Sequence, residues 1–290
     1  MDERCQMTRF TAAALVATLA LTSGFDYAVP GTRVQLKKTQ LNFYCSGTGT
    51  PVVLMEAGLG GRASQWKSVA EPLATVTTVC SYDRAGYGFS SAGPFPRTSA
   101  QIASELWEAV RALRLNGPYI LVGTSFGVFD LRLFAKEHPN AVAGAVLVNP
   151  SAAEEELEAA DPAIVQIDAN GLNNAKRCLA AARTGDLKTN STMAQECIGQ
   201  TDDSAAGRVR RQLLSEPTFW SALVSEWSSI RLSAQEVFDS SQRFGDRPLI
   251  VISTGKDADY THTSKAQRLA LIPLPGPMGR CLRHSISSRF

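Results

Sequence analysis

Short apolar runs alternate with longer helical patterns along residues 32–148. Residues 32–36 and 40–44 alternate polar and apolar positions around a charged turn, which predicts an antiparallel hairpin. The continuous apolar run at residues 52–55 is typical of a strand buried on both faces. Further strands are predicted at residues 76–82, 119–122 and 142–148, and helices at residues 64–73, 99–115 and 126–137. This alternation predicts an α/β fold with a mostly parallel sheet and helices on both faces.

The pattern changes after Pro150. Residues 151–245 show no strand pattern, are rich in helix-forming residues and are interrupted by Pro and Gly, which predicts a helical insertion. A strand pattern returns at residues 248–252, so both flanks of the insertion are sheet strands. We therefore expect one domain, with a first part at residues 31–150, the insertion at 151–245 and a second part at 246–290, rather than two independent domains.

One segment of the insertion carries apolar residues at helical spacing. They are Phe219, Trp220, Leu223, Val224, Trp227, Ile230 and Leu232. This spacing is more typical of the core of a helical unit than of substrate contacts. Because the insertion leaves the sheet at the carboxyl end of a strand, we expect it to cover that end as a cap.

Residues 1–24 resemble a secretory leader rather than part of the fold. Arg4 and Arg9 precede an apolar run at residues 10–21, which is too short to span a bilayer. Small residues follow it, as signal peptidases require. We expect export and no stable membrane span; an N-terminal helix and an uncleaved membrane tether are the alternatives.

The charge balance limits the classes of partner. Lys and Arg number 29 against 27 Asp and Glu, which gives a net charge of +2 with no long run of one sign. Such a balance argues against a nucleic-acid partner. With 44% apolar residues, the chain has enough material for a sizeable core.

The cysteines predict disulfides rather than a metal site. None shows C-x-x-C or Cys/His spacing, so zinc is not expected. The spacing of Cys178 and Cys197 suits a local bridge between two helices. Cys45 and Cys80 suit a bridge between neighbouring strands, with free buried thiols as the alternative.

The segment Gly123-Thr124-Ser125-Phe126-Gly127 fits G-x-S-x-G. It follows a predicted buried strand and opens a predicted helix, which is the context that this motif requires. The flanking glycines allow a sharp turn that exposes the Ser125 hydroxyl above the sheet. The helix N-terminus then directs the Phe126 N–H to the place where an oxyanion would form. Ser125 is therefore the predicted nucleophile.

With this motif, the sequence resembles the α/β-hydrolase family over residues 32–257. E-A-G-L-G-G at residues 56–61 follows the third strand, where the family has its oxyanion-hole loop. Y-D-R-A-G-Y-G-F-S at residues 82–90 follows the fourth strand. The resemblance implies that Leu59 supplies a second oxyanion-hole N–H beside that of Phe126. Ala57 stands where many members carry His, but the hole is formed by backbone.

The resemblance also implies the order serine, acid, histidine. Asp257 follows the strand at residues 249–252, where the family has its acid, and Asp259 is the reserve. A helix cap or a turn is the structural alternative for Asp257. Asn149, at the end of the preceding strand, cannot serve as a carboxylate.

The chain has three histidines as candidates for the base. His138 lies at the far end of the helix that follows Ser125, and His262 comes too soon after Asp257; both are expected to be structural or solvated. His284 has the family position, late in the chain. However, residues 273–284 contain three prolines and two glycines, and six residues follow His284. The sequence therefore does not clearly predict the final strand and helix of the family, and we expect a truncated or altered C-terminus.

These residues predict acyl transfer. His284 would take the proton of Ser125, Asp257 would orient the imidazole, and an acyl-enzyme would form and be hydrolysed. No metal or organic cofactor is required. Serine at the elbow argues against the branches with a carboxylate nucleophile, namely dehalogenases and epoxide hydrolases.

A carboxylesterase acting on a small-molecule ester is therefore the leading interpretation, and amide, lactone and peptide substrates stay open. Other activities on this scaffold, such as C–C hydrolysis, cofactor-free peroxidation or transacylation, are alternatives. A non-catalytic or defective scaffold with an incomplete triad is a further alternative.

Overall fold

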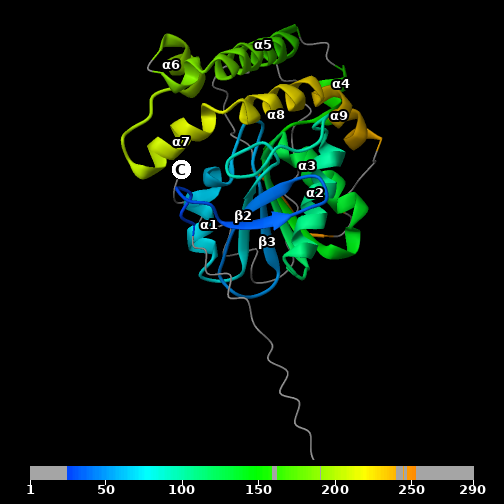
Figure 1. Cartoon of the computed structure of the whole chain (residues 1–290). Helices are drawn as coiled ribbons and strands as arrows, with labels where there is room; N and C mark the ends of the chain where they lie inside the picture. Colours follow the sequence, from blue (N-terminus) through cyan, green and yellow to red (C-terminus); the bar gives the residue numbers. More distant parts are fainter. Residues whose placement is uncertain (1–24, 159–161, 190, 240–243, 245–246, 253–290) are drawn as a thin grey trace, which may run out of the picture.

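A computed structural model of the chain describes residues 25–158, 162–189, 191–239, 244 and 247–252. In this part of the chain, seven strands form one sheet in the order β1-β2-β4-β3-β5-β6-β7 (Figure 1). The strands are β1 (Thr32–Gln35), β2 (Gln40–Ser46), β3 (Val52–Glu56), β4 (Val79–Asp83), β5 (Tyr119–Ser125), β6 (Val142–Pro150) and β7 (Leu249–Ile252). Strand β2 pairs antiparallel with β1 and β4, and the remaining pairs are parallel. The predicted mostly parallel α/β fold is confirmed.

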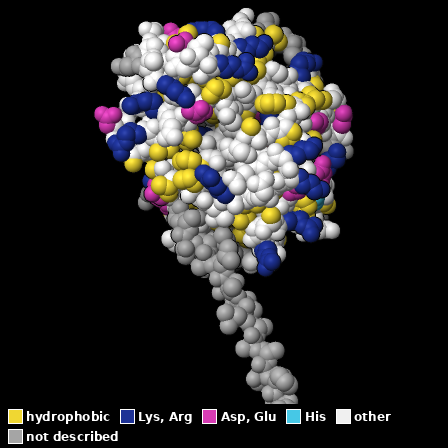
Figure 2. Space-filling model, in the orientation of Figure 1, with side chains coloured by type: hydrophobic (Ala, Val, Ile, Leu, Met, Phe, Trp, Pro, Cys, Tyr) yellow, Lys and Arg dark blue, Asp and Glu magenta, His cyan; other side chains and the backbone are white. Residues whose placement is uncertain are grey.

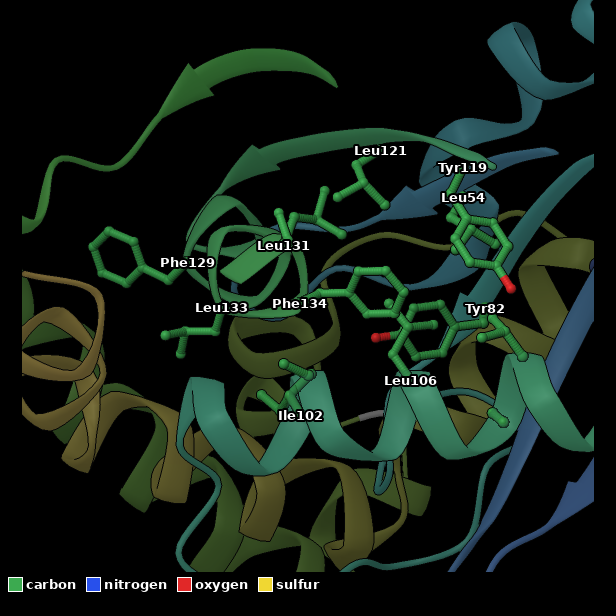
Figure 3. Close-up of a cluster of buried hydrophobic side chains, with 14 of the residues drawn as sticks. Leu54, Tyr82, Ile102, Leu106, Tyr119, Leu121, Phe129, Leu131, Leu133 and Phe134 are labelled. Atoms are coloured by element: carbon green, nitrogen blue, oxygen red, sulfur yellow. The ribbon is translucent and has the colours of Figure 1, made fainter. Parts of the chain in front are cut away.

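Helices cover both faces of the sheet. On one face lie α2 (Ser99–Ala112) and α3 (Gly127–Glu137), whose inward side chains form the main core with the strands. Figure 3 shows Ile102 and Leu106 of α2 turned toward Phe134 of α3 and the strands behind it. On the other face, η1 (Ala63–Trp66) and α1 (Lys67–Leu73) bury Trp66 and Ala70 against the sheet. Strand β3 is buried along its whole length, as its uninterrupted apolar run predicted, and β4 is equally buried although its sequence includes Ser81 and Asp83.

A short 3-10 turn, η2 (Pro139–Ala141), precedes β6. The described chain between β6 and β7 is helical. Its helical segments are α4 (Ala153–Glu158), α5 (Pro162–Thr184), η3 (Asp186–Lys188), α6 (Thr192–Ile198), α7 (Ala205–Leu214), α8 (Pro217–Ser228) and α9 (Ile230–Phe238). Helices α5 and α8 pack on each other and lie above the sheet in Figure 1. The helical pattern predicted for this segment is therefore observed.

The apolar residues predicted for one insertion core do not all share one core. Phe219, Trp220 and Leu223 of α8 pack with α5 and α6, as expected. Ile230 instead joins the main core, because α9 packs against α2 and α3. Leu232 is half exposed, so it belongs to neither core. The apolar spacing continues from residue 219 to residue 232, but α8 ends at Ser228. The next helix, α9, begins at Ile230 and packs against different helices.

Both predicted disulfides are present. Cys45 and Cys80 are directly paired residues of β2 and β4 and are bonded to each other. Cys178 of α5 is bonded to Cys197 of α6. Three of these cysteines are fully buried in apolar clusters, so each bridge stabilises a packed core rather than a surface loop.

Several predictions fall outside the described residues. They include the leader at residues 1–24 and all of Asp257, Asp259, His262 and His284. Within the described segments, no helix is long and apolar enough to cross a membrane. On the face shown in Figure 2, basic side chains are interspersed with acidic ones, in keeping with the small net charge.

Candidate active site

Ser125 occupies a strained turn between β5 and α3. It is the last residue of β5, and its φ of +51° lies in the left-handed region, which non-glycine residues rarely adopt. Such a conformation costs about 1–3 kcal/mol and persists only where the surrounding structure imposes it. The ladder between β5 and β6 shifts register here, from Thr124 opposite Val148 to Ser125 opposite Pro150. The predicted elbow is therefore observed at the predicted residue.

The two glycines of the motif are required by close packing. A Cβ atom at Gly123 would lie 2.6 Å from Cδ1 of Leu131. At Gly127, it would overlap the carbonyl oxygen of Ala57 and lie 2.8 Å from Cγ of Glu56. Helix α3 can therefore pack closely on β5 because Gly123 lacks a side chain, and it can begin directly against the end of β3 because Gly127 does.

The loop after β3 approaches the elbow closely. A Cβ atom at Gly58 would lie 3.3 Å from Cβ of Ser125 and 3.4 Å from the carbonyl oxygen of Thr124. Leu59 follows Gly58 in this loop, and Phe126 caps the N-terminus of α3. The structure thus brings together Ser125 and the segments that carry Leu59 and Phe126. Asp257 and His284, the predicted acid and base, are not placed by the described residues.

Asp83, the last residue of β4, fixes the loops around this point. One of its carboxylate oxygens accepts the Ala63 N–H at 3.0 Å. The other accepts the Phe89 N–H at 3.2 Å and the Asn42 side-chain N–H at 3.1 Å. Burial raises the pKa of Asp83, and these three donors oppose the rise. A Cβ atom at Gly88, where φ is +50°, would overlap this carboxylate, which explains a glycine at that turn.

Arg84, the next residue, is fully buried and binds the loop after β3. Its Nη1 donates to Oε1 of Glu56 at 2.8 Å and to the carbonyl oxygen of Ala57 at 2.6 Å. Its Nη2 donates to the carbonyl oxygen of Gly58 at 2.8 Å. A single side chain thus holds two successive carbonyl groups of the loop that approaches Ser125.

The same guanidinium binds Glu226 of α8. Nε of Arg84 donates to Oε1 and Nη2 donates to Oε2, each at 3.0 Å. The Tyr87 hydroxyl also donates to Oε2 of Glu226, at 2.8 Å. With the loop contacts, all five N–H donors of Arg84 are satisfied. Glu226 is fully buried, so this ion pair connects α8 to the loop in a dry environment.

The charges in this cluster compete with one another. Burial would lower the pKa of Arg84, but the carboxylates of Glu226 and Glu56 raise it well above its ordinary value, so the guanidinium stays charged. Burial raises the pKa of Glu56, against the pull of Arg84 and of the Tyr82 hydroxyl that donates to it. Asp130 of α3 is also buried, and burial together with the charge of Glu56 raises its pKa well above the ordinary carboxyl value.

Sequence reasoning did not identify Glu56, Arg84 and Glu226 as part of this site. The sequence did contain a signal for Glu56 and Arg84. These opposite charges lie at the ends of β3 and β4, two buried strands that are neighbours in the sheet, and buried charges require a partner. Glu226 lies at helical spacing between Leu223 and Ile230, in the middle of the predicted apolar stripe. A carboxylate in such a stripe requires a buried partner.

Other features of the described chain lie apart from this site. His138 stacks on Trp107 with ring centroids 3.7 Å apart and ends α3, which confirms its structural role. A cavity of about 560 Å³ lies among η3, α6 and α7, and neither Ser125 nor Leu59 nor Phe126 lines it. Among the described residues, no group of three or more His, Cys, Asp or Glu side chains could hold a metal ion.

Comparison with protein families gives one match over most of the chain. Residues 50–257 match the family described as "alpha/beta hydrolase fold". The matched segment includes the Ser125 elbow and ends at Asp257.

Two sequence relatives match a shorter part. The "Uncharacterized protein YqjL" of Bacillus subtilis is 30% identical over 105 residues, 36% of this chain and 42% of that protein. The "Putative carbamate hydrolase RutD" of Klebsiella pneumoniae is 37% identical over 103 residues, 35% of this chain and 38% of that protein. The matches thus span less than half the length of either relative.

Solved structures share the fold at low sequence identity. A variant of a "putative epoxide hydrolase" from Pseudomonas aeruginosa has a TM-score of 0.64 at 19% identity, covering 80% of this chain and 81% of that chain. A "putative alpha/beta hydrolase" from Nostoc sp PCC 7120 has a TM-score of 0.60 at 18% identity, covering 77% and 80%. At these identities the likeness shows the fold alone.

Proposed function

Because the chain belongs to the alpha/beta hydrolase family, we propose that it is a serine hydrolase whose nucleophile is Ser125. The observation that carries this proposal is the left-handed backbone of Ser125 at the junction of β5 and α3. Strain of this kind is stored where it serves a function, and here it presents a hydroxyl beside a helix N-terminus.

The proposed reaction proceeds through an acyl-enzyme. Oγ of Ser125 attacks the substrate carbonyl carbon while His284 takes the hydroxyl proton and Asp257 holds the imidazole. The resulting oxyanion accepts N–H bonds from Leu59 and Phe126. The leaving alcohol departs with the proton from His284, and a water molecule then releases the acid by the same steps in reverse.

The strand register supports this assignment of the acid. Thr124 of β5 pairs with Val148 of β6, and Val148 pairs with Ile252 of β7. The carboxyl end of β7 therefore lies level with the elbow and two strand spacings away, about 10 Å. Asp257 follows five residues later in the sequence, within reach of a base placed beside Ser125.

Acyl transfer is favoured over the chemistry of the epoxide hydrolase neighbours. In those branches of the family, the resemblance implies a carboxylate nucleophile at the elbow, whereas this chain has Ser125. A serine alkoxide suits a carbonyl substrate, so we propose a small-molecule carboxylic ester. Helix α8 contacts the loops after β3 and β4, so the helices between β6 and β7 are proposed to cap the site.

A carbamate is the second candidate substrate. The observation that favours it is the 37% identity, over 103 residues, to the Klebsiella relative named "Putative carbamate hydrolase RutD". Carbamates carry the same electrophilic carbonyl, so the proposed residues would keep their roles.

A substrate panel tests this proposal. Wild-type protein and Ser125→Ala are assayed against matched nitrophenyl esters, carbamates and amides and against an epoxide. We expect turnover of the ester or carbamate by the wild type and a loss of at least about a thousandfold in Ser125→Ala. Epoxide turnover, equal rates of the two proteins, or a folded wild type that turns over none of the carbonyl substrates would contradict the proposal.

We also propose that the protein is exported. The supporting observations are the leader pattern at residues 1–24 and the two disulfides, since disulfides persist in oxidising compartments. Mass spectrometry of the protein from a periplasmic or culture fraction should find the linked peptides and a cleaved N-terminus. Recovery of the protein in the cytoplasm with free thiols would contradict export.

A further inference from the structure

We infer that Glu226 of α8 is a positioning residue for the proposed oxyanion hole, acting through Arg84 on the peptide group between Gly58 and Leu59. This inference rests on the proposed function, because it concerns the Leu59 N–H as an oxyanion donor. It adds a residue from a distant part of the chain, 142 positions from Arg84, that touches no reacting atom in the proposed mechanism.

The first step concerns the direction of one N–H bond. In a planar trans peptide, the C=O and N–H of the same unit point in opposite directions. Nη2 of Arg84 donates to the carbonyl oxygen of Gly58 at 2.8 Å, and the Gly61 N–H donates to the same oxygen at 2.9 Å. The Leu59 N–H therefore points away from Arg84. The guanidinium and the Gly61 N–H together hold this peptide group, and the guanidinium is the partner that a side chain from outside the loop supplies.

The second step concerns what holds the guanidinium. Glu56 binds one side of it and Glu226 binds the other, and Glu226 uses both of its oxygens. A planar guanidinium held by a carboxylate at two points cannot rotate without breaking a charge-assisted hydrogen bond. Tyr87 donates to Oε2 of Glu226 and lies edge-on to Phe219, which fixes the carboxylate in turn.

The third step concerns contact between α8 and the loops. A Cβ atom at Gly86 would lie 2.5 Å from Cβ of Ala222, and one at Gly60 would lie 3.7 Å from Cδ1 of Leu223. Helix α8 therefore rests directly on the loops after β4 and β3. Glu226 and these apolar contacts act together, so α8 helps to hold the Leu59 donor in its orientation.

The chain contains a matched control for this ion pair. Arg97 and Glu105 form a second buried pair with two bonds of 2.7 Å each. Its side chains link the middle of α2 to the preceding loop, and their hydrogen bonds among the described residues do not include residues 57–59. Glu226→Gln and Glu105→Gln therefore make the same chemical change in a similar environment. Only Glu226→Gln should alter the orientation of the Leu59 N–H.

The kinetic experiment measures kcat and KM on a nitrophenyl ester and the inhibition constant of phenylboronic acid, which forms a tetrahedral adduct with a serine hydroxyl. We expect Glu226→Gln to lower kcat by about tenfold or more and to weaken boronate binding, with KM within about twofold. Glu105→Gln should leave kcat within about twofold. Tyr87→Phe, which keeps the ion pair, should fall between the two and serves if Glu226→Gln does not fold. Equal kcat values for the two Gln variants, or a change confined to KM, would overturn the inference.

A second measurement is independent of activity. Hydrogen exchange of the backbone amides at residues 56–61 should accelerate in Glu226→Gln and remain at the wild-type rate in Glu105→Gln. If the wild type shows no activity on any carbonyl substrate, the proposed function fails and this exchange still tests the link between Glu226 and the loop. Unchanged exchange in Glu226→Gln would overturn the inference while leaving the proposed function intact.

Discussion

Gly58 lies directly against Ser125: a Cβ atom on the glycine would come within 3.3 Å of Cβ of the serine. The backbone of Gly58 is not left-handed, so an added methyl group would act by contact and not by backbone strain. Gly58 lies in the loop after β3 and Ser125 ends β5, and the parallel pairing of these two strands brings their carboxyl ends together.

Replacing Gly58 by Ala should therefore affect activity more than stability. We expect the methyl group to push the loop a few tenths of an ångström away from Ser125 and to lower kcat/KM by up to about tenfold, since displacement of a catalytic group by about 1 Å can cost about a hundredfold. The cost in stability should be about 1 kcal/mol.

Gly185→Ala is the control for this substitution. Gly185 has a φ of +86° and open space around it, so Ala should introduce backbone strain of about 1 kcal/mol without a clash. Ester kinetics and thermal melts of the two variants separate the effects. A Gly58→Ala variant with wild-type kcat/KM would contradict the placement of this loop in the active site.

The sequence allowed the framework of this site to be predicted because its signals are local. A continuous apolar run marks β3, and helical spacing of Ile102 and Leu106 marks α2. The motif around Ser125 combines a strand, a turn and a helix within a few residues. Each of these features depends on residues that are close together in the sequence, so the pattern of apolar and polar residues is enough to predict it.

The polar network around Arg84 could not be predicted in the same way. Its partners lie on β3 and on α8, far away in the sequence, and which strands and helices meet is decided by packing. Likewise, the helical pattern of the insertion did not separate Ile230 from Leu223, because the direction of α9 depends on α2 and α3. Asp257 and His284 stay predictions.

The buried carboxyl of Asp130 predicts a pH dependence of stability. Neither of its oxygens has a hydrogen-bond partner among the described residues. Burial and then the charge of Glu56 raise its pKa, more than Arg84 and the nearby Ser99 hydroxyl lower it. Because the folded chain then binds this proton more tightly than the unfolded chain, stability decreases as the pH rises from the ordinary carboxyl pKa to the raised one.

Asp130→Asn should remove this dependence. Relative to wild type, we expect the variant to gain up to about 1.4 kcal/mol in free energy of unfolding for each pH unit within that window. Denaturant unfolding at pH 5 and pH 8 measures the difference, which should be larger at pH 8. Asp203→Asn, at an exposed position, controls for the change in charge. An equal difference at the two pH values would show that Asp130 is already ionised across this range.

The bridge between Cys178 and Cys197 should stabilise the helices between β6 and β7. It closes a loop of 19 residues and lies in the cluster that α5 and α6 share with α8. Loop-closure entropy gives a contribution of about 3 kcal/mol for a loop of this length. The double variant Cys178→Ser/Cys197→Ser should therefore unfold at lower denaturant concentration, as should the wild type in the presence of a reductant.

The Cys178→Ser single variant provides the comparison for this bridge. It should resemble the double variant, because either serine removes the covalent link. Suppose that the double variant, the single variant and the reduced wild type all have free energies of unfolding within about 0.5 kcal/mol of the oxidised wild type. That result would contradict a stabilising bridge at this position.

Labelling of Ser125 by a fluorophosphonate probe, read by peptide mass spectrometry, tests the proposed nucleophile most directly. The probe reacts with activated serine hydroxyls and with few others, so no knowledge of the natural substrate is needed. We predict one modified peptide that carries the probe on Ser125, and none in Ser125→Ala. A cooperatively folded wild-type protein that takes up no probe at Ser125, or that takes it up equally at other serines, would contradict the assignment of Ser125 as the nucleophile.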